Sequence, residues 1–330
     1  METAAFSSHE MAEIEEMNQS EILLSTDKPF IQANTVESSL EEISRKHIIP
    51  VFTKDNQTLI SQADFIETAA DVIREIYPAE MILSPAVRLS HAIKGRIPEA
   101  KLKPASELLE HEKTLYYERM AFIIEVPTIQ DDIDGNRLSL TIGGIKAYNL
   151  DNLYGKKGAD EHFKVFIGFQ NKVCTNLCIF SDGYISDLTV KSLGQLKGCI
   201  RTMVENYNAQ YHIHAMRKLA NHSLTEQEFA LLIGRCRMYS HLPPAMRNDV
   251  VPLTLSDTQL GAVVRDYYRD DSFCRGDDGK INLWRLYNLF TGTNKSSYID
   301  TFLDRSVNAF RFVENLGNAL DRKETNWFLN

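Results

Sequence analysis

Long apolar runs are missing from this 330-residue sequence, although 43% of its residues are hydrophobic. No window approaches the roughly 18–20 consecutive apolar residues that a membrane-spanning helix needs. The first residues also lack the basic start and the apolar run of a secretory signal peptide. We therefore expect a cytoplasmic protein with no membrane partner.

Cysteine is also scarce, and the five cysteines are odd in number and scattered. They do not form the paired pattern of a disulfide framework, which agrees with a reducing compartment. Three residues separate Cys174 from Cys178, whereas a zinc knuckle needs two, together with a second pair at a suitable distance. We interpret the stretch from Phe163 to Tyr184 as sheet, and we expect no metal and no other cofactor.

Motifs that identify enzyme families are absent too. The sequence contains no P-loop, no dinucleotide-binding fingerprint, no nucleophile elbow and no kinase signature. Its paired glycines, Gly143 and Gly144, lie inside a strand pattern, where they indicate a bulge or a close backbone approach. The motifs therefore assign no reaction to this chain.

Negative charge is concentrated at the start of the chain. Residues 1–45 carry ten acidic and two basic side chains, whereas the remainder carries 35 acidic and 34 basic side chains. The net charge of −9 therefore comes almost entirely from the first segment. We predict that residues 1–45 are an acidic, mostly disordered arm, in which residues 40–46 can form a helix.

Four strand-like segments follow one another in the first half of the body. They are separated by hairpin-length breaks, apart from one long loop over residues 149–161, and the break at Asp134–Gly135 has the residues of a tight turn. This order predicts an antiparallel meander. The segments are residues 120–129, 137–150, 163–169 and 173–180.

Helical patterns flank these strands. Before the strands, two apolar runs around "KDNQ" predict a hairpin over residues 48–60. Directly after this hairpin, Ser61, with Asp64 three residues later, predicts the start of a helix. After the strands, apolar residues at helical spacing predict one long helix over residues 193–219. Thr225 and Ser256 each begin a capping box with a hydrophobic staple, and both predict further helix starts.

Strands followed by helices indicate an α+β fold, with a meander packed against a long helix and a helical C-terminal subdomain. We divide the chain into three parts on this basis. They are the arm over residues 1–45, an α+β domain with the antiparallel sheet over 46–220, and the helical subdomain over 221–330.

One group of basic residues is a candidate nucleic-acid interface. Lysine and arginine on a flexible loop suit contacts with phosphates, although a solvated loop is the alternative interpretation. Exposed aromatic residues beside them, such as Tyr116, Tyr117 or Trp284, would support binding of single strands. The group consists of Arg88, Lys94, Arg96, Lys101, Lys103, Arg235 and Arg237.

A second group is a candidate polar cluster. Asp300, Asp304 and Asn308 recur at every fourth position on one face of the last predicted helix. Asn176 is unusual within a strand pattern, where asparagine is disfavoured. The alternative for the three helix residues is a solvated face. The alternatives for Asn176 are a bulge or a buried, hydrogen-bonded amide.

Several stretches resemble a family of uncharacterised proteins that mobile genetic elements of Bacteroides and related gut bacteria carry. They include "IKGRIPEAKLKPASELLEHEKTLYYERMAF", "FKVFIGFQNKVCTNLCIFSDGY" and "INLWRLYNLFTGTNKSSYIDTFLDRSVNAF", and the likeness spans roughly residues 45–321. The "VCTN" and "NLWRLYN" stretches are more distantly similar to the phage/plasmid-like family of unknown function. The resemblance implies a bacterial mobile element and provides no catalytic residue.

Three hypotheses about function follow. The first is a DNA-associated accessory protein of a mobile element, acting on single strands. The second is an interaction protein that recruits or counters a host factor through its acidic arm. The third and least favoured is an enzyme of unrecognised type, which requires a pocket where Asn176, Asp300, Asp304 and Asn308 converge. The oligomeric state is left open.

Overall fold

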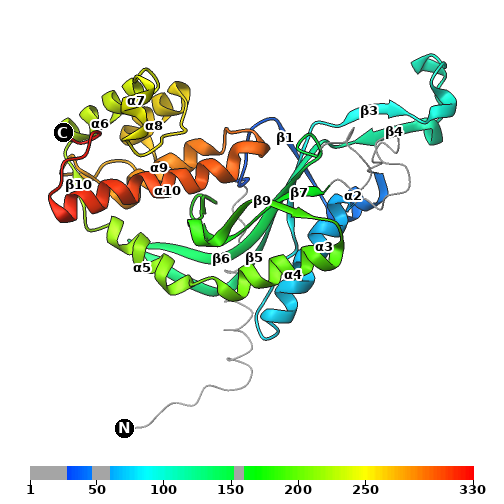
Figure 1. Cartoon of the computed structure of the whole chain (residues 1–330), viewed down its shortest axis with the longest axis horizontal. Helices are drawn as coiled ribbons and strands as arrows, with labels where there is room; N and C mark the ends of the chain where they lie inside the picture. Colours follow the sequence, from blue (N-terminus) through cyan, green and yellow to red (C-terminus); the bar gives the residue numbers. More distant parts are fainter. Residues whose placement is uncertain (1–27, 47–59, 152–159) are drawn as a thin grey trace, which may run out of the picture.

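The structure is a computed structural model that describes residues 28–46, 60–151 and 160–330 (Figure 1). Residues 1–27 of the predicted arm, most of the predicted hairpin over 48–60, and most of the predicted long loop lie outside the described residues. The remainder contains a curled antiparallel sheet with helices on both faces, so the α+β prediction is confirmed.

The sheet has seven strands in the order β1-β2-β5-β6-β7-β8, and β9 pairs with β7. Strands β5 to β8 are neighbours in chain order, so the predicted meander is confirmed. The bounds are β1 Thr35–Ser38, β2 Ala86–Ser90, β5 Arg119–Ile133, β6 Asn136–Ala147, β7 Glu161–Asn171, β8 Leu177–Cys178 and β9 Tyr184–Val190.

Local sequence explains the long β5–β6 hairpin. Asp134 and Gly135 connect the two strands with φ of 51° and 75°, the conformation that a tight two-residue turn requires. The register shifts between Val126 and Gln130, and Pro127 lies in that interval. Proline has no backbone N–H to donate, so a strand accommodates it at such an irregularity.

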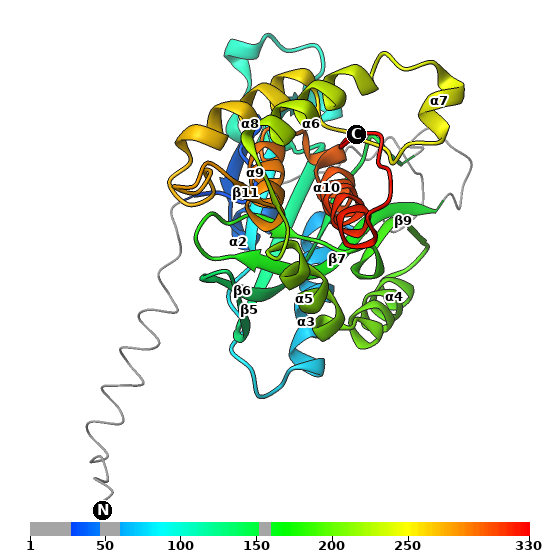
Figure 2. The same cartoon turned by 90° about the vertical axis from the view of Figure 1, so that its left-hand side faces the viewer.

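The described residues form the following helices: α2 Leu40–Lys46, α3 Gln62–Ile76, α4 Leu193–Asn206, α5 Ala209–Leu219, α6 Glu226–Tyr239, α7 Pro244–Asn248, α8 Asp257–Arg269, α9 Leu283–Asn294 and α10 Ile299–Arg322. Helices α3 and α4 cover one face of the sheet, and α10 crosses the other face (Figures 1 and 2). The capping boxes at Ser61, Thr225 and Ser256 are present, so these three predicted helix starts are confirmed. The short strands β10 Ser223–Leu224 and β11 Ile281–Asn282 pair beside the helical region.

The paired glycines allow α3 to pack closely on the sheet. The ring of Phe65 meets the rings of Phe122 and Phe163, with centroids 5.0 and 4.9 Å away. A Cβ atom at Gly144 would lie 2.5 Å from a ring carbon of Phe65, so a larger residue would force the helix outward. The close backbone approach that the sequence predicts at these glycines is therefore confirmed.

The single long helix predicted over residues 193–219 is wrong. Helix α4 ends at Asn206, and α5 begins at Ala209. Between them, the side chain of Asn208 accepts a hydrogen bond from the N–H of Tyr211 at 2.9 Å. Asparagine caps a helix better than it continues one, so the local capping preference overrides the apolar periodicity.

The strand predicted over residues 173–180 is too long. Only Leu177–Cys178 pairs with β7, because residues 172–176 form a turn. Thr175 has a φ of 58°, and its N–H donates to the carbonyl of Asn171 at 2.8 Å. This left-handed residue reverses the chain before β8 begins.

Much of the predicted basic loop is a projecting hairpin arm. Strand β3 (Ile93–Arg96) pairs with β4 (Lys113–Tyr116), and the arm extends away from the sheet (Figure 1). The short helices η2 (Pro98–Ala100), η3 (Ala105–Glu107) and η4 (Glu110–Glu112) form its tip. We call residues 93–116 the β3–β4 arm.

Residues 28–45, predicted to belong to a mostly disordered arm, are part of the fold. Strand β1 pairs with β2, and Phe30 and Ile31 are buried against the face of the sheet that α10 covers. The two apolar side chains explain this correction, since their burial favours an ordered segment. The division into three parts otherwise stays a prediction.

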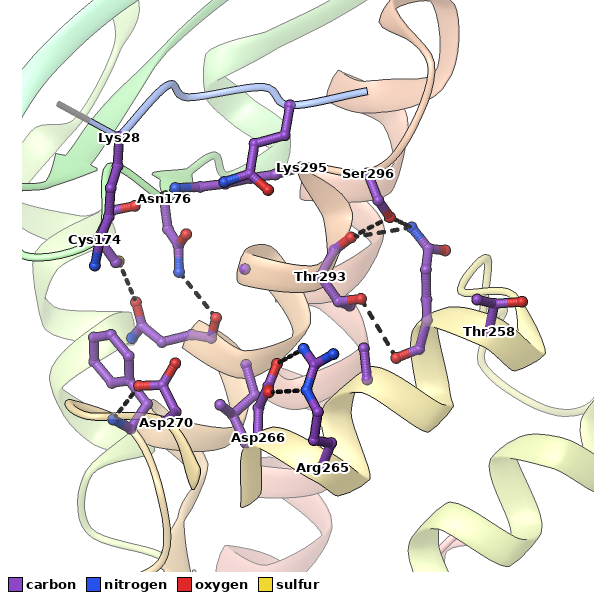
Figure 3. A pocket seen from close by; sticks show the side chains of 17 residues that line it. Lys28, Cys174, Asn176, Thr258, Arg265, Asp266, Asp270, Thr293, Lys295 and Ser296 are labelled. Atoms are coloured by element: carbon purple, nitrogen blue, oxygen red, sulfur yellow. Dashed lines mark hydrogen bonds and ion pairs between the residues drawn. The ribbon is translucent and has the colours of Figure 1, made fainter. Parts of the chain in front are cut away.

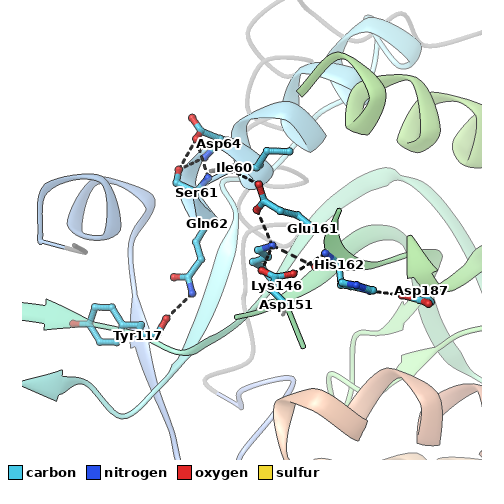
Figure 4. Close-up of polar contacts among 10 residues, drawn as sticks. All are labelled: Ile60, Ser61, Gln62, Asp64, Tyr117, Lys146, Asp151, Glu161, His162 and Asp187. Carbon is cyan, nitrogen blue, oxygen red and sulfur yellow. Dashed lines mark hydrogen bonds and ion pairs between the residues drawn. The ribbon is translucent and has the colours of Figure 1, made fainter. Parts of the chain in front are cut away.

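A buried lysine joins the sheet to the segment before α3 (Figure 4). Lys146 is fully buried on β6, and its ammonium pairs with Asp151 at 2.8 Å and Glu161 at 3.0 Å. The second oxygens of these carboxylates accept from the N–H groups of His162, at 2.8 Å, and Ile60, at 3.0 Å. We call Lys146, Asp151 and Glu161 the buried ion triad.

The triad leads to a stability prediction. Lys146→Ala leaves two buried carboxylates without their cation, so we expect the free energy of unfolding to fall by about 3–5 kcal/mol. Lys197→Met is the matched control, because Lys197 forms a partly exposed ion pair with Glu75 and should contribute less than about 1 kcal/mol. Urea denaturation measures both, and equal losses would contradict the assignment.

Candidate functional site

A cavity of about 440 Å³ lies where the sheet edge meets the helical region (Figure 3). Its walls come from the β7–β8 turn, from α8 and α9, from the loop after α9 and from the segment at residues 28–32. The volume falls within the range of roughly 300–1,000 Å³ that is typical of small-molecule sites.

A buried asparagine holds one wall in place. Asn288, on α9, is 1% exposed, and its side-chain oxygen accepts from Asn171 Nδ2 at 3.1 Å. Its own Nδ2 donates to the carbonyl of Trp284 at 3.0 Å, and its backbone carbonyl accepts from Asn176 Nδ2 at 2.9 Å. The bonds from Asn171 and Asn176 hold the end of β7 and the β7–β8 turn on α9, and the bond to Trp284 fixes the Asn288 amide within the helix.

Asn176 has one amide atom that no described residue satisfies. The residue is 2% exposed, and the bond from its Nδ2 to a carbonyl fixes which way the amide faces. Its Oδ1 is buried at the cavity wall and has no hydrogen-bond partner among the described residues (Figure 3). Burying an acceptor without a hydrogen-bond donor lowers the free energy of unfolding by about 1–3 kcal/mol.

The turn beside Asn176 is strained. Thr175 is β-branched and has a φ of 58°, a conformation that costs about 1–3 kcal/mol and occurs mostly at functional sites. Because of this conformation, the carbonyl of Cys174 and the hydroxyl of Thr175 both accept from the ammonium of Lys295, the latter at 2.7 Å. The turn therefore positions a lysine as well as an amide.

Cys174 is a weak candidate for a nucleophile. Its Sγ lies 3.9 Å from Asn288 Oδ1, and burial raises the pKa of the thiol to about 11. The thiol is therefore protonated at neutral pH, whereas attack requires the thiolate. The cavity is equipped to bind a molecule by hydrogen bonds and charge rather than to attack it through sulfur.

Helix α8 and the loop after it supply charged groups on the opposite wall. Arg265 and Asp266 pair through two contacts of 2.7 and 2.9 Å. Asp270 accepts from the N–H groups of Ser272 and Phe273 at 2.9 and 2.7 Å. Both carboxylates therefore already have partners. In the part of the chain that the structure describes, no group of three or more His, Cys, Asp or Glu residues could hold a metal ion.

The predicted polar cluster does not form as one site. Asp300 pairs with Arg119 at 2.8 Å, and Asp304 accepts from Lys164 and from the hydroxyl of Tyr184 at 2.5 and 2.7 Å. These contacts fix α10 on strands β5, β7 and β9. Among the described residues, Asn176 forms no hydrogen bond with either aspartate and lines the cavity instead.

Asn308, the fourth member, stabilises a loop. Its oxygen accepts from the N–H and the hydroxyl of Thr254, at 3.0 and 2.9 Å, and its Nδ2 donates to the carbonyl of Pro252 at 2.8 Å. The regular spacing on the last helix thus reflects two different structural roles, since the aspartates bind the sheet and the asparagine binds a loop.

The predicted nucleic-acid residues are divided among three places. Arg88 lies on β2, four others lie on the β3–β4 arm or at its tip, and Arg235 and Arg237 lie on α6. The arm and α6 are at opposite ends of the molecule in Figure 1, so the basic residues do not form one groove.

Most of these basic residues also interact with neighbouring groups. Arg88 donates to Thr35 and pairs with Glu37, which secures β1. The guanidinium of Arg235 lies 5.1 Å from the centre of the Trp327 ring.

The other pairs are Arg96 with the carbonyl of Lys103, Lys103 with Glu112, and Arg237 with Asp257. Trp284 is fully buried, so it offers no surface on which a base could stack.

Two residues of the cavity wall, Gly292 and Lys295, were not predicted from the sequence. Gly292 lies within α9, where a Cβ atom would be 3.7 Å from Asn176 Nδ2 and 3.9 Å from Oδ1. Packing therefore leaves room for a larger residue, and the glycine keeps the space beside Asn176 open. Lys295 follows α9 in a polar loop, and no pattern distinguishes it from a solvated lysine.

The chain belongs to a protein family whose model matches residues 13–329 and is described as "Domain of unknown function, B. Theta Gene description (DUF3871)". This agrees with the unknown function and the Bacteroides origin that the resemblance implied. Comparison with curated proteins and with solved structures gave no match. None of the helices in the described ranges has the length and apolar composition of a membrane span.

The wall of the cavity can be tested by substitution. Asn288→Leu leaves Asn171 Nδ2 without its acceptor and removes the side-chain bond between the end of β7 and α9, so we expect a loss of about 1–3 kcal/mol in the free energy of unfolding. Asn318→Leu, at an exposed position of α10, should change it by less than about 0.5 kcal/mol. Equal values in urea denaturation would show that Asn288 does not organise the wall.

Proposed function

We propose that this protein binds a small polar organic molecule in the cavity between the β7–β8 turn, α8 and α9. The unpartnered, buried Oδ1 of Asn176 at the cavity wall carries the proposal. An acceptor buried in this way is satisfied when a ligand brings an N–H or O–H donor to it. Ligand binding would thus offset the free-energy cost of burying Oδ1 of Asn176 without a hydrogen-bond donor.

Gly292 supports the same proposal. A glycine inside a helix is less favourable than alanine by about 0.5–1 kcal/mol, and no contact closer than 3.7 Å requires it here. Its lack of a side chain leaves open the space that a ligand needs to approach Asn176.

Association with DNA, the first hypothesis from the sequence, is less well supported. Of its seven candidate residues, only Lys94 and Lys101 have side chains without a hydrogen bond or ion pair to another described residue. Both lie on the β3–β4 arm, and two lysines neutralise few phosphates, whereas DNA-binding affinity grows with the number neutralised. The mobile-element context stays a prediction from the resemblance.

The other two hypotheses fare differently. Most of the acidic arm lies outside the described residues, so recruitment of a host factor stays a prediction. The enzyme hypothesis required four polar residues at one pocket, and only Asn176 lines the cavity. We therefore propose binding rather than a reaction.

A thermal-shift assay tests the proposal with a panel of amino acids, nucleosides and nucleoside monophosphates. Gly292→Leu fills the space beside Asn176, and Gly234→Leu is its control on the exposed side of α6. We expect at least one compound to raise the Tm of the wild type and of the control by about 5 °C at saturation. The same compound should not stabilise Gly292→Leu. Equal responses of all three proteins, or no response in the wild type, would contradict the proposal.

A further inference from the structure

Lys295 connects three parts of the cavity wall. Its backbone carbonyl accepts from the N–H groups of Gln32 and Ala33 at 2.8 and 3.0 Å, which holds the N-terminal segment. Its ammonium reaches the β7–β8 turn, where it donates to the carbonyl of Cys174 and to the hydroxyl of Thr175. The residue is 5% exposed and lines the cavity (Figure 3).

The charge of this ammonium has no counter-ion among the described residues. Both of its acceptors are neutral, and no described carboxylate forms an ion pair with it. Of the two carboxylates on the opposite wall, Asp266 pairs with Arg265, and Asp270 accepts two backbone N–H groups. A charge is rarely buried unless it is paired, so an anion from outside the described residues would complete this site.

Lys146 provides the internal comparison. It is fully buried, and two carboxylates lie 2.8 and 3.0 Å from its ammonium. The chain therefore compensates one buried lysine fully and leaves the other facing a cavity with neutral partners. This difference indicates that Lys295 has a task other than stabilising the fold.

We infer that the ligand of this cavity is a small organic anion, whose carboxylate or phosphate pairs with the ammonium of Lys295 and which donates a hydrogen bond to Oδ1 of Asn176. The inference rests on the proposed function and narrows its ligand class. Lys28, also on the cavity wall, adds a second positive charge near the same end.

Binding should then depend on pH. Burial lowers the pKa of Lys295 to about 8, and the charged or titratable groups that share the cavity wall with it are Lys28, Cys174, Arg265, Asp266 and Asp270. Because the anion needs the protonated amine, the affinity should fall by about tenfold between pH 7 and pH 9. Burial keeps Cys174 protonated over this interval, so the thiol adds no opposing charge.

Matched pairs of probes test the inference by isothermal titration calorimetry on the full chain. N-Acetylated amino acids are compared with their amides, and nucleoside monophosphates with their nucleosides, so each pair is an anion and its neutral counterpart. We expect the anionic member of one pair to bind the wild type at least about tenfold more tightly at pH 7. The pair that responds identifies the anion as carboxylate or phosphate.

Variants separate the inference from the proposed function. Lys295→Met should abolish the preference for the anion and its pH dependence, whereas Lys197→Met, a surface control on α4, should retain both. Equal affinity for charged and neutral members, or a preference that survives Lys295→Met, would overturn the anion inference while the binding site stands. If no probe binds either the wild type or Gly292→Leu, the proposed function itself is wrong.

Discussion

A lysine can be buried in a folded protein only if something compensates its charge, and this constraint governs both polar centres of the molecule. At Lys146, the chain supplies two carboxylates, and their remaining oxygens hold the backbone at His162 and Ile60. The result is a closed centre that joins β6, β7 and the approach to α3.

Lys295 meets the same constraint differently. Its partners are two neutral oxygens on a turn that is itself strained at Thr175, and the Asn176 amide holds this turn against α9 by donating to the backbone carbonyl of Asn288. The unsatisfied oxygen of Asn176 lies on the same turn. Within the described ranges, a strained residue, an ammonium without a counter-ion and an acceptor without a donor thus occur together at one cavity.

The sequence predicts the regular parts of this architecture, because these parts depend on local signals. The turn at Asp134–Gly135, the capping boxes and the alternation in the meander specify their own conformations. The break at Asn208 overrides an apolar pattern that continues through it, and Thr175 interrupts a segment with strand-like composition. Both departures arise from single residues whose effect competes with the surrounding pattern.

The candidate site is less predictable for a physical reason. Asn176 was noticeable because asparagine is rare in strands, but its partners lie more than one hundred positions away on α9. The roles of Lys295 and Gly292 depend on the sheet edge that packs beside them, which the local sequence does not specify. Lys146 left a faint signal, since a lysine on the apolar face of a strand needs a partner, yet the identity of that partner also depends on the tertiary fold.

The most direct test of the central claim is an NMR titration of the lysine side chains in the ligand-free, full-length protein. Labelled lysine carbons report each ammonium, and Lys295→Arg identifies the resonance of Lys295 by its loss. A buried ammonium without a counter-ion should titrate with a pKa of about 8. A pKa near the ordinary value of about 10.4 would contradict the account, since it would mean that the protein or the solvent already compensates this charge.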